Sequence, residues 1–265
     1  MLIMGKIIVV YSKPYNSEQE TSLKVAEKSL QSKKADYILC DRKSLNSSDF
    51  LDAEIVIAVG GDGTFLRASH FIKGKILIFG MNSDPANKEG FYMGSNRYDF
   101  DGKLERILER KFRIKKLIRL EASINKKRVS EPALNEYYFG SAKPYLTSRY
   151  SIEIGGEKER QRSSGVLIAT PTGSEAWLKA SGVKVRQPSG NIAYSVREPY
   201  ERKILSNYKL RGGILGQNAE IKIKPEMEGR ILVADSLSRE YPLKYGDTLT
   251  VKISDSFLSV IDFSA

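Results

Sequence analysis

Short apolar, β-branched runs alternate with helix-like segments over the first hundred residues. Apolar positions spaced by three or four residues predict a helix over 16–34, with Asn16 or Ser17 as its cap and Leu23, Ala26 and Leu30 on one face. A second helix is predicted at "FLRASHFIK", 65–73. Four strands are predicted, at 6–12, 36–40, 54–60 and 75–82. This alternation predicts a parallel sheet with helices on its faces.

The pattern changes after about residue 100. The segment "RYDFDGKLERILERKF", 97–112, has helical spacing and is predicted to connect two domains. Beyond it, polar and apolar residues alternate between turns rich in Gly, Pro, Asn and Asp, which is typical of antiparallel sheets. We therefore predict an α/β, Rossmann-like N-terminal domain over 1–99 and a β-rich C-terminal domain over 100–249.

The net charge of +11, from 43 basic and 32 acidic residues, favours anionic partners. The densest basic run, 110–128, interleaves its charges with Ile and Leu as a half-exposed strand does, and lacks the aromatic or zinc-finger spacing of nucleic-acid readers. No apolar run approaches the roughly 20 residues that span a bilayer. We expect neither a nucleic-acid nor a membrane partner. The abundance of Lys and Glu is typical of thermophilic proteins.

Few residues are candidates for redox or metal chemistry. Cys40 is the only cysteine, which excludes an internal disulfide and fits a reducing cytoplasm, and its apolar strand predicts a buried thiol. The start of the chain resembles a first strand rather than a signal peptide, so we expect a cytoplasmic protein. His70 is the only histidine and lacks partners at metal-ligand spacing, so no metal site is predicted in the protein itself.

The stretch "GGDGT", 60–64, lies where a predicted buried strand passes into a helix. One interpretation is structural: the glycines adopt positive φ in a tight turn and Asp62 caps the helix. The other is that backbone N–H groups hold a polyphosphate, while Asp62 takes a proton from an acceptor hydroxyl or binds the metal on the phosphates. Neither the Walker loop nor the dinucleotide fingerprint is present.

Two further motifs follow in the second half. In "ALNEYYFG", Asn135 and Glu136 are adjacent, so a regular strand would point them to opposite faces, whereas an irregular end would let both bind a ribose. In "ATPTGSEAW", 169–177, Thr172 or Ser174 could cap a following helix or bind a nucleotide at its N-terminus. Trp177 could stack on a base or pack in the interior.

Taken together, "GGDGT", "ALNE" and "ATPTGSEAW" resemble the motifs of the NAD kinase family, in the same order and at similar spacing. The segments "NSDPANKEGFYM" and "GRILVADS…YPLKYGDTLTVKIS" extend the resemblance over nearly the whole chain, which reads as a divergent, archaeal or thermophilic member. "GGDGT" is shared with diacylglycerol, sphingosine and phosphofructo-kinases, and the third motif is the specific one.

The resemblance implies a two-domain NAD kinase that phosphorylates the 2′-hydroxyl of the adenosine ribose of NAD, with ATP or polyphosphate as donor, magnesium bound to ATP, and a homodimer or homotetramer. It also implies that the tail, about 250–265, packs back on the first domain. The implied catalytic residue is Asp62, as base or as orienter of the hydroxyl. The implied binding residues are Gly60, Gly61, Gly63 and Thr64 for the donor phosphates, Asn135 and Glu136 for the ribose, and Thr172, Ser174, Ala176 and Trp177 for the adenine.

The chain departs from the family pattern at two places. Ser164 occupies the position of an aspartate that the family associates with the nicotinamide side of NAD. The segment after the third motif contains Arg197 and Glu198, which could form an ion pair or a subunit contact. A lipid kinase with the same glycine loop and a nucleotide-binding regulator without catalysis are therefore the alternative functions.

Overall fold

The computed structural model describes residues 5–143, 145–183, 190–200, 207–237 and 239–264. The chain divides into two compact units. Unit 1 contains Met1–Leu117 and Leu258–Ala265, and unit 2 contains Ile118–Phe257.

Unit 1 is built on a seven-stranded sheet in the order β2-β1-β3-β4-β19-β6, with the short β5 paired to β4. Strands β1 to β4 run parallel, so their carboxyl ends share one edge of the sheet. The strands are β1 (Lys6–Tyr11), β2 (Tyr37–Asp41), β3 (Ala53–Gly60), β4 (Leu77–Asn82), β5 (Ser95–Asn96), β6 (Arg113–Leu117) and β19 (Leu258–Asp262). The helices are α1 (Ser17–Ser32), α2 (Asp62–Ser69), α3 (Phe100–Leu108) and the 3₁₀ turn η1 (Ser47–Phe50).

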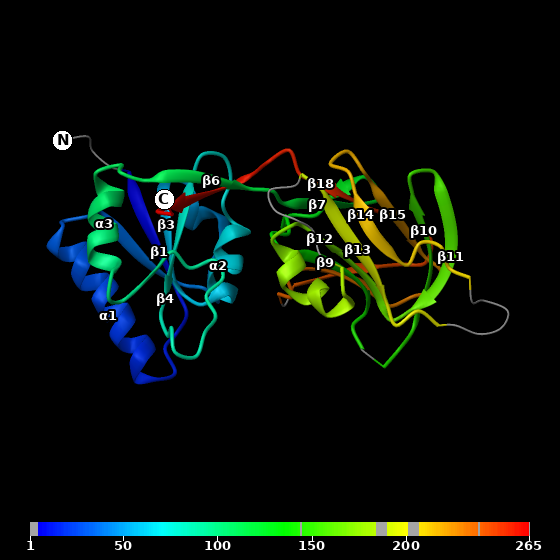
Figure 1. The fold of residues 1–265 in the computed structure, drawn as a ribbon, viewed down its shortest axis with the longest axis horizontal. Helices are drawn as coiled ribbons and strands as arrows, with labels where there is room; N and C mark the ends of the chain where they lie inside the picture. Colours follow the sequence, from blue (N-terminus) through cyan, green and yellow to red (C-terminus); the bar gives the residue numbers. More distant parts are fainter. Residues whose placement is uncertain (1–4, 144, 184–189, 201–206, 238, 265) are drawn as a thin grey trace. The chain divides into compact units, whose positions relative to one another are not determined.

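Helices α1 and α3 cover one face of this sheet, and α2 lies on the other (Figure 1). Helix α1 begins as predicted, because the Asn16 side chain accepts a hydrogen bond from Gln19 N at 3.0 Å. Its Ala26 and Leu30 are fully buried against Val9 and Ile57, which fixes the helix on the sheet through its apolar face.

The division of the chain differs from the predicted boundary at 99/100. Helix α3 belongs to unit 1, because Phe100, Leu104 and Ile107 are fully buried in the same core as α1. Strand β6 also belongs there, since it pairs antiparallel with β19. The tail returns to unit 1 at Leu258 rather than at about 250, and β18 remains in unit 2.

Unit 2 is a sandwich of two six-stranded antiparallel sheets, ordered β11-β10-β15-β18-β7-β8 and β14-β13-β12-β9-β16-β17. The strands are β7 (Leu120–Ile124), β8 (Lys127–Arg128), β9 (Glu136–Ser141), β10 (Ser148–Ile154), β11 (Glu157–Ser163), β12 (Gly165–Ala169), β13 (Ile192–Arg197), β14 (Gly212–Leu215), β15 (Ile221–Pro225), β16 (Arg230–Ala234), β17 (Glu240–Leu243) and β18 (Leu249–Ile253). Alternate residues of both sheets, such as Ile152 and Ile168, fill the space between them and form one apolar core.

The helix predicted after "ATPTGS" is two short 3₁₀ segments, η2 (Gly173–Glu175) and η3 (Trp177–Ser181). Leu178 of η3 is fully buried and packs with Leu167 and Ile231 on the outer face of the second sheet. A short covering segment suffices here because it buries one leucine and part of one tryptophan, not a continuous helical stripe.

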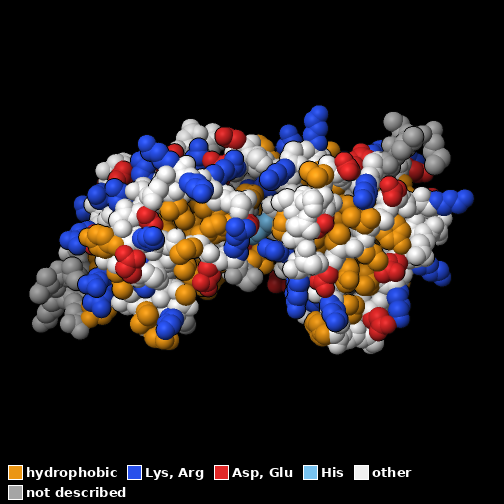
Figure 2. Space-filling model, turned by 180° about the vertical axis from the view of Figure 1, so that it is seen from behind, with side chains coloured by type: hydrophobic (Ala, Val, Ile, Leu, Met, Phe, Trp, Pro, Cys, Tyr) orange, Lys and Arg blue, Asp and Glu red, His pale blue; other side chains and the backbone are white. Residues whose placement is uncertain are grey.

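Positive charge is dispersed over one face of the molecule. On the face drawn in Figure 2, basic side chains lie between acidic ones and apolar patches rather than in one continuous band. The expectation that nucleic acid is not a partner stays a prediction. Within the described residues, no helix combines the length and apolar character needed to span a bilayer.

Cys40 is half-buried rather than fully buried, because its strand β2 is the edge strand of the sheet.

Candidate functional site

The glycine loop forms the turn from β3 into α2, at the carboxyl edge of the sheet in unit 1. The positive φ expected for these glycines is wrong: Gly61 has φ −125°, and none of the three adopts a left-handed conformation. Close packing requires the glycine instead, because a Cβ on Gly60 would lie 2.2 Å from Thr64 Oγ1. Thr64 is fully buried and its N–H donates to Gly61 O at 2.8 Å.

Asp62 does not cap helix α2. The N-cap is Gly61, without a side-chain hydrogen bond, and Asp62 is the first helical residue. Its carboxylate reaches the turn after β4 instead, where Oδ2 accepts from Phe91 N at 3.1 Å and Oδ1 accepts from Tyr92 N at 2.9 Å. Two carboxylate oxygens offer about four acceptor positions. The carboxylate is therefore fixed in direction and retains capacity to accept from a hydroxyl.

Asn135 and Glu136 lie together in unit 2 at the start of β9, where the backbone is held by one carboxylate. Asp235 accepts hydrogen bonds from Leu134 N at 2.9 Å, Asn135 N at 2.6 Å and Glu136 N at 3.2 Å. Asp235 has a positive φ of 52° at the end of β16. Both motif side chains are buried, with 9% exposure for Asn135 and 2% for Glu136. This carboxylate, which sequence reasoning missed, organises the Asn-Glu pair.

Glu136 is a buried acid with one unsatisfied oxygen. Ser236 Oγ donates to its Oε1 at 3.0 Å, whereas Oε2 has no hydrogen-bond partner among the described residues. Burial first, and the charge of Asp235 second, raise the pKa of Glu136 to about 8. The side chain is therefore mostly protonated at neutral pH, and as a carboxylic acid it can donate to one ligand oxygen and accept from another.

Thr172 is at the N-cap position of the 3₁₀ segment η2 but makes no side-chain capping hydrogen bond, and Ser174 lies inside that segment. Ser174 Oγ donates to Pro171 O at 2.7 Å, and the Thr172 hydroxyl lies 3.0 Å from that of Thr170. The segment also touches the Asn-Glu motif, because Thr170 N donates to Asn135 O at 2.9 Å. A Cβ on Gly173 would lie 1.9 Å from the same carbonyl oxygen, so only glycine fits. The structure thus brings the second and third motifs together.

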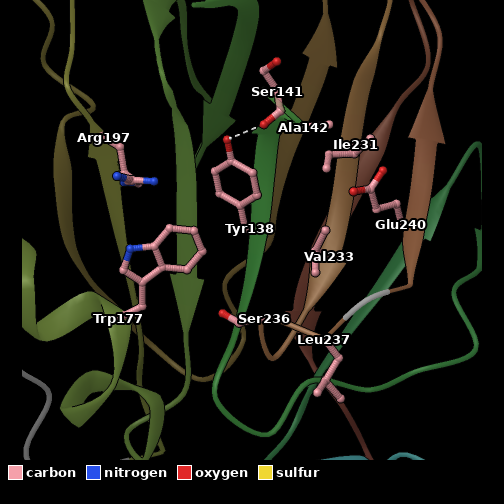
Figure 3. Close-up of a pocket in the computed structure, with 10 residues that line it drawn as sticks. All are labelled: Tyr138, Ser141, Ala142, Trp177, Arg197, Ile231, Val233, Ser236, Leu237 and Glu240. Atoms are coloured by element: carbon pink, nitrogen blue, oxygen red, sulfur yellow. Dashed lines mark hydrogen bonds between the residues drawn. The ribbon is translucent and has the colours of Figure 1, made fainter. Parts of the chain in front are cut away.

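A pocket of about 430 Å³ lies on the outer face of the β9-containing sheet (Figure 3). Its lining residues are Tyr138, Ser141, Ala142, Trp177, Arg197, Ile231, Val233, Ser236, Leu237 and Glu240. Trp177 packs against Tyr138 with ring centroids 5.3 Å apart, and the Arg197 guanidinium lies 4.7 Å from its ring. Arg197 also pairs with Glu198 at 3.1 Å. Of the predicted adenine residues, Trp177 lines this pocket, whereas Thr172, Ser174 and the exposed Ala176 are not among its lining residues.

No group of three His, Cys, Asp or Glu side chains that could hold a metal occurs in the part of the chain that the structure describes. His70 is buried at the C-cap of α2. Ser164 is half-buried before β12, where its carbonyl accepts from the Tyr138 hydroxyl at 3.0 Å.

The raised pKa of Glu136 predicts a pH-dependent stability. Between its ordinary pKa of 4.5 and about 8, the folded protein holds a proton that the unfolded chain releases. The stabilisation from this proton is fully present below pH 4.5 and is lost as pH rises to about 8. We expect Glu136→Gln to make the free energy of unfolding of the unliganded protein less dependent on pH across this window. Urea unfolding at several pH values measures this.

The exposed Glu220 provides the control, and Glu220→Gln should leave the pH dependence unchanged. Equal slopes for the wild type and Glu136→Gln would show that the folded protein does not retain the proton.

The family model described as the ATP-NAD kinase N-terminal domain matches residues 2–112. A probable NADH kinase from Oryza sativa subsp. japonica is 30% identical over 254 residues, covering 88% of this chain and 78% of the relative. An NAD kinase from Thermoplasma volcanium is 26% identical over 215 residues, covering 80% and 75%.

Two solved structures share the fold. The NAD kinase from Archaeoglobus fulgidus in complex with ATP superposes with a TM-score of 0.77 at 21% identity, covering 97% of this chain and 93% of its own. Yeast NADH kinase complexed with NADH gives 0.76 at 19% identity, covering 98% and 84%. The motifs, the fold and the identity to the rice protein agree: the chain belongs to the NAD kinase family and is a phosphotransferase.

Proposed function

We propose that the protein transfers the terminal phosphoryl group of ATP to the 2′-hydroxyl of the adenosine ribose of NAD, giving NADP and ADP. Family membership supports the kinase chemistry, and the relatives are named NAD or NADH kinases. The observation that carries the acceptor side is the buried Glu136, whose Oε2 has no partner within the described residues. A desolvated acid with a spare oxygen, beside Asn135, suits a sugar hydroxyl.

In this reaction the Gly60–Thr64 loop binds the donor phosphates and Asp62 orients or deprotonates the acceptor hydroxyl. The bond from the terminal phosphorus to the bridging oxygen of ADP breaks, and a bond from that phosphorus to the ribose oxygen forms. The hydroxyl proton leaves to Asp62 or, if Asp62 binds the metal, to solvent. Most of the acceleration comes from positioning and charge stabilisation.

Magnesium fits this scheme as an ion that arrives with the donor. The described residues form no acidic cluster that would hold it alone, and both Asp62 oxygens already accept backbone N–H groups while keeping lone pairs. When bound, the ion supplies charge neutralisation on the phosphates. Asp62 is the residue of this loop that would contact it.

NADH is the second candidate acceptor. Two of the similar proteins are named NADH kinases. Ser164 provides no negative charge where the family resemblance places an acid near the nicotinamide. The lack of this charge removes a preference for the cationic ring of NAD over the neutral ring of NADH.

The test incubates the purified protein with each acceptor, NAD or NADH, in combination with each donor, Mg-ATP or polyphosphate. Product formation is measured by separating NADP and NADPH from their precursors. We expect product with ATP from at least one acceptor. If the folded protein forms no product in any combination, the proposal is wrong, and diacylglycerol phosphorylation should be assayed next. The oligomer, which we infer to be a dimer or tetramer, is tested by light scattering on the same sample.

A further inference from the structure

Three loops of unit 1 converge at the carboxyl edge of its sheet. Because β2, β3 and β4 belong to one parallel sheet in the order β2-β1-β3-β4, the residues that follow them leave the sheet at the same edge. Arg42 follows β2, the glycine loop follows β3, and Lys88 lies in the loop after β4. Sequence reasoning did not single out either cation.

The two cations flank the glycine loop on its two sides. A Cβ on Gly63 would lie 3.4 Å from Arg42 Nη1, and a Cβ on Gly61 would lie 3.0 Å from Lys88 Cδ. Arg42 Nη1 also donates to Thr64 Oγ1 at 3.5 Å. Each glycine beside Asp62 therefore faces a different basic side chain.

Neither cation is neutralised by an ion pair with a described residue. Lys88 Nζ donates to the Ser83 hydroxyl at 3.1 Å and lies 5.7 Å from the centre of the Tyr15 ring. Burial lowers the pKa of Lys88, the charge of Asp84 partly offsets this, and the smaller effect of the Arg42 charge lowers the pKa further. Two positive charges beside the same glycine loop favour the binding of an anion at that loop.

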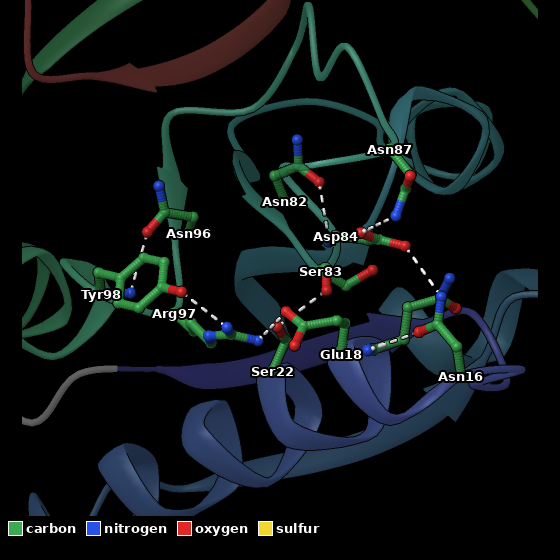
Figure 4. A network of polar contacts seen from close by, with 11 residues as sticks. Asn16, Glu18, Ser22, Asn82, Ser83, Asp84, Asn87, Asn96, Arg97 and Tyr98 are labelled. Atoms are coloured by element: carbon green, nitrogen blue, oxygen red, sulfur yellow. Dashed lines mark hydrogen bonds and ion pairs between the residues drawn. The ribbon is translucent and has the colours of Figure 1, made fainter.

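The loop that carries Lys88 is fixed by a buried polar network (Figure 4). Asp84 is fully buried and accepts from Asn16 Nδ2 and Asn87 Nδ2, each at 3.0 Å, while its own N–H donates to Asn82 Oδ1 at 3.0 Å. Ser22 of α1 donates to Ser83 O at 2.9 Å. Lys88 is thus presented from a rigid loop, which reduces the conformational entropy lost when it binds a ligand.

We propose that Arg42 and Lys88 bind the phosphates of the phosphoryl donor from opposite sides of the glycine loop. The ligand is a chain of linked phosphates, because its charge must outweigh repulsion from Asp62 between the two glycines and its length must reach both cations. ATP and inorganic tripolyphosphate share this chemistry. The inference rests on the proposed function, because it names the side chains that would bind the phosphoryl donor of that reaction.

The test measures binding of ATP and of inorganic tripolyphosphate by calorimetry, together with steady-state kinetics. We expect Arg42→Gln and Lys88→Met each to raise the Kd for the bound phosphate ligand about tenfold or more, the scale of one lost charge-assisted hydrogen bond. The KM for ATP should rise in parallel while the KM for the dinucleotide stays unchanged. Lys75→Gln removes an equal charge before β4, at the opposite edge of the sheet, and should bind like the wild type.

The outcomes distinguish a nucleotide donor from phosphates in general. They also distinguish a failure of this inference from a failure of the proposed function. Wild-type binding of both ligands, lost in both variants, assigns the pair to phosphates in general, and binding of ATP alone assigns it to a nucleotide donor. If Lys88→Met folds poorly, Lys88→Arg is used as a second variant. It keeps the positive charge and should keep most of the affinity for the phosphate ligand. If the wild type makes no NADP but binds phosphates, and the variants lose this binding, the proposed function is refuted and this inference is supported. Donor Kd values within twofold of wild type in both folded variants would overturn it.

Discussion

Replacement of Asp62 by Asn is expected to lower turnover with saturating ATP and dinucleotide by about a hundredfold or more, the scale of a positioned acid–base group. Asparagine keeps the size of the side chain but removes the negative charge that would orient or deprotonate the acceptor hydroxyl. NADP formation by Asp62→Asn beside the wild type, under identical donor and acceptor concentrations, is the measurement.

The structure adds a second effect that the experiment has to separate. In the wild type both carboxylate oxygens accept a backbone N–H, one from Phe91 and one from Tyr92. An asparagine offers one acceptor and turns its amide donors toward the other N–H, so the turn after β4 loses one hydrogen bond, worth about 1 kcal/mol. We therefore expect a small decrease in thermal stability together with the large loss of turnover.

The control is Asp52→Asn, the same chemical change at an exposed position before β3. It should leave both turnover and stability at wild-type values. If Asp62→Asn retains full turnover, Asp62 has only the structural role of holding the Phe91–Tyr92 turn. A large fall in stability with a proportionate fall in activity would point to the same conclusion.

Replacement of Arg119 by Met is expected to lower the free energy of unfolding by about 2–4 kcal/mol, the cost of losing hydrogen bonds from a buried charged donor. The Arg119 side chain is 1% exposed, and its guanidinium donates to Ser256 O at 3.2 Å, to Ser256 Oγ at 2.6 Å and to Phe257 O at 3.3 Å. Methionine fills a similar volume but leaves these oxygens unsatisfied.

The position of Arg119 in the chain explains why a charged group with a high free-energy cost of burial is kept. Unit 2 begins at Ile118 and ends at Phe257, so Arg119 joins the first and last residues of the unit. Ser254 N donates to Arg119 O at 2.8 Å and completes the connection. Burial lowers the pKa of Arg119 to about 10, which leaves the group charged at neutral pH.

Urea unfolding followed by circular dichroism measures the effect, with Arg128→Met as the matched control. Arg128 forms an ion pair with Glu121 at 2.9 Å, but its side chain is 63% exposed, so its loss should change stability by less than about 1 kcal/mol. Equal midpoints for the two variants would show that the Arg119 hydrogen bonds contribute no net stability.

The sequence predicted well those features that depend on local pattern. The buried strands of unit 1 and helix α1 with its Asn16 cap follow from β-branched runs, 3.6-residue spacing and a side chain that satisfies a free N–H. The glycine loop after β3 could be located because a parallel strand that ends in glycines before a helix is a local signal. The family resemblance rests on three such short motifs.

Other features depend on contacts between residues far apart in the chain. Asp235 holds the backbone of Asn135 and Glu136 from a hundred positions away, and no local pattern marks it. Arg42 and Lys88 are ordinary charged loop residues until the sheet places them beside Gly61 and Gly63. Asp62 was expected as a possible helix cap, but the turn at Phe91 offered its carboxylate better-placed N–H groups.

The sequence alone therefore determined the fold class, the order of the elements and the motifs at the strand ends, because periodicity and turn chemistry act over a few residues. Only the tertiary structure decided where unit 1 ends, since α3 and β6 join it through burial of Phe100 and pairing with β19. It also decided the protonation of Glu136, because the pKa of a carboxyl group depends on the solvent and charges around it and not on its neighbours in the chain.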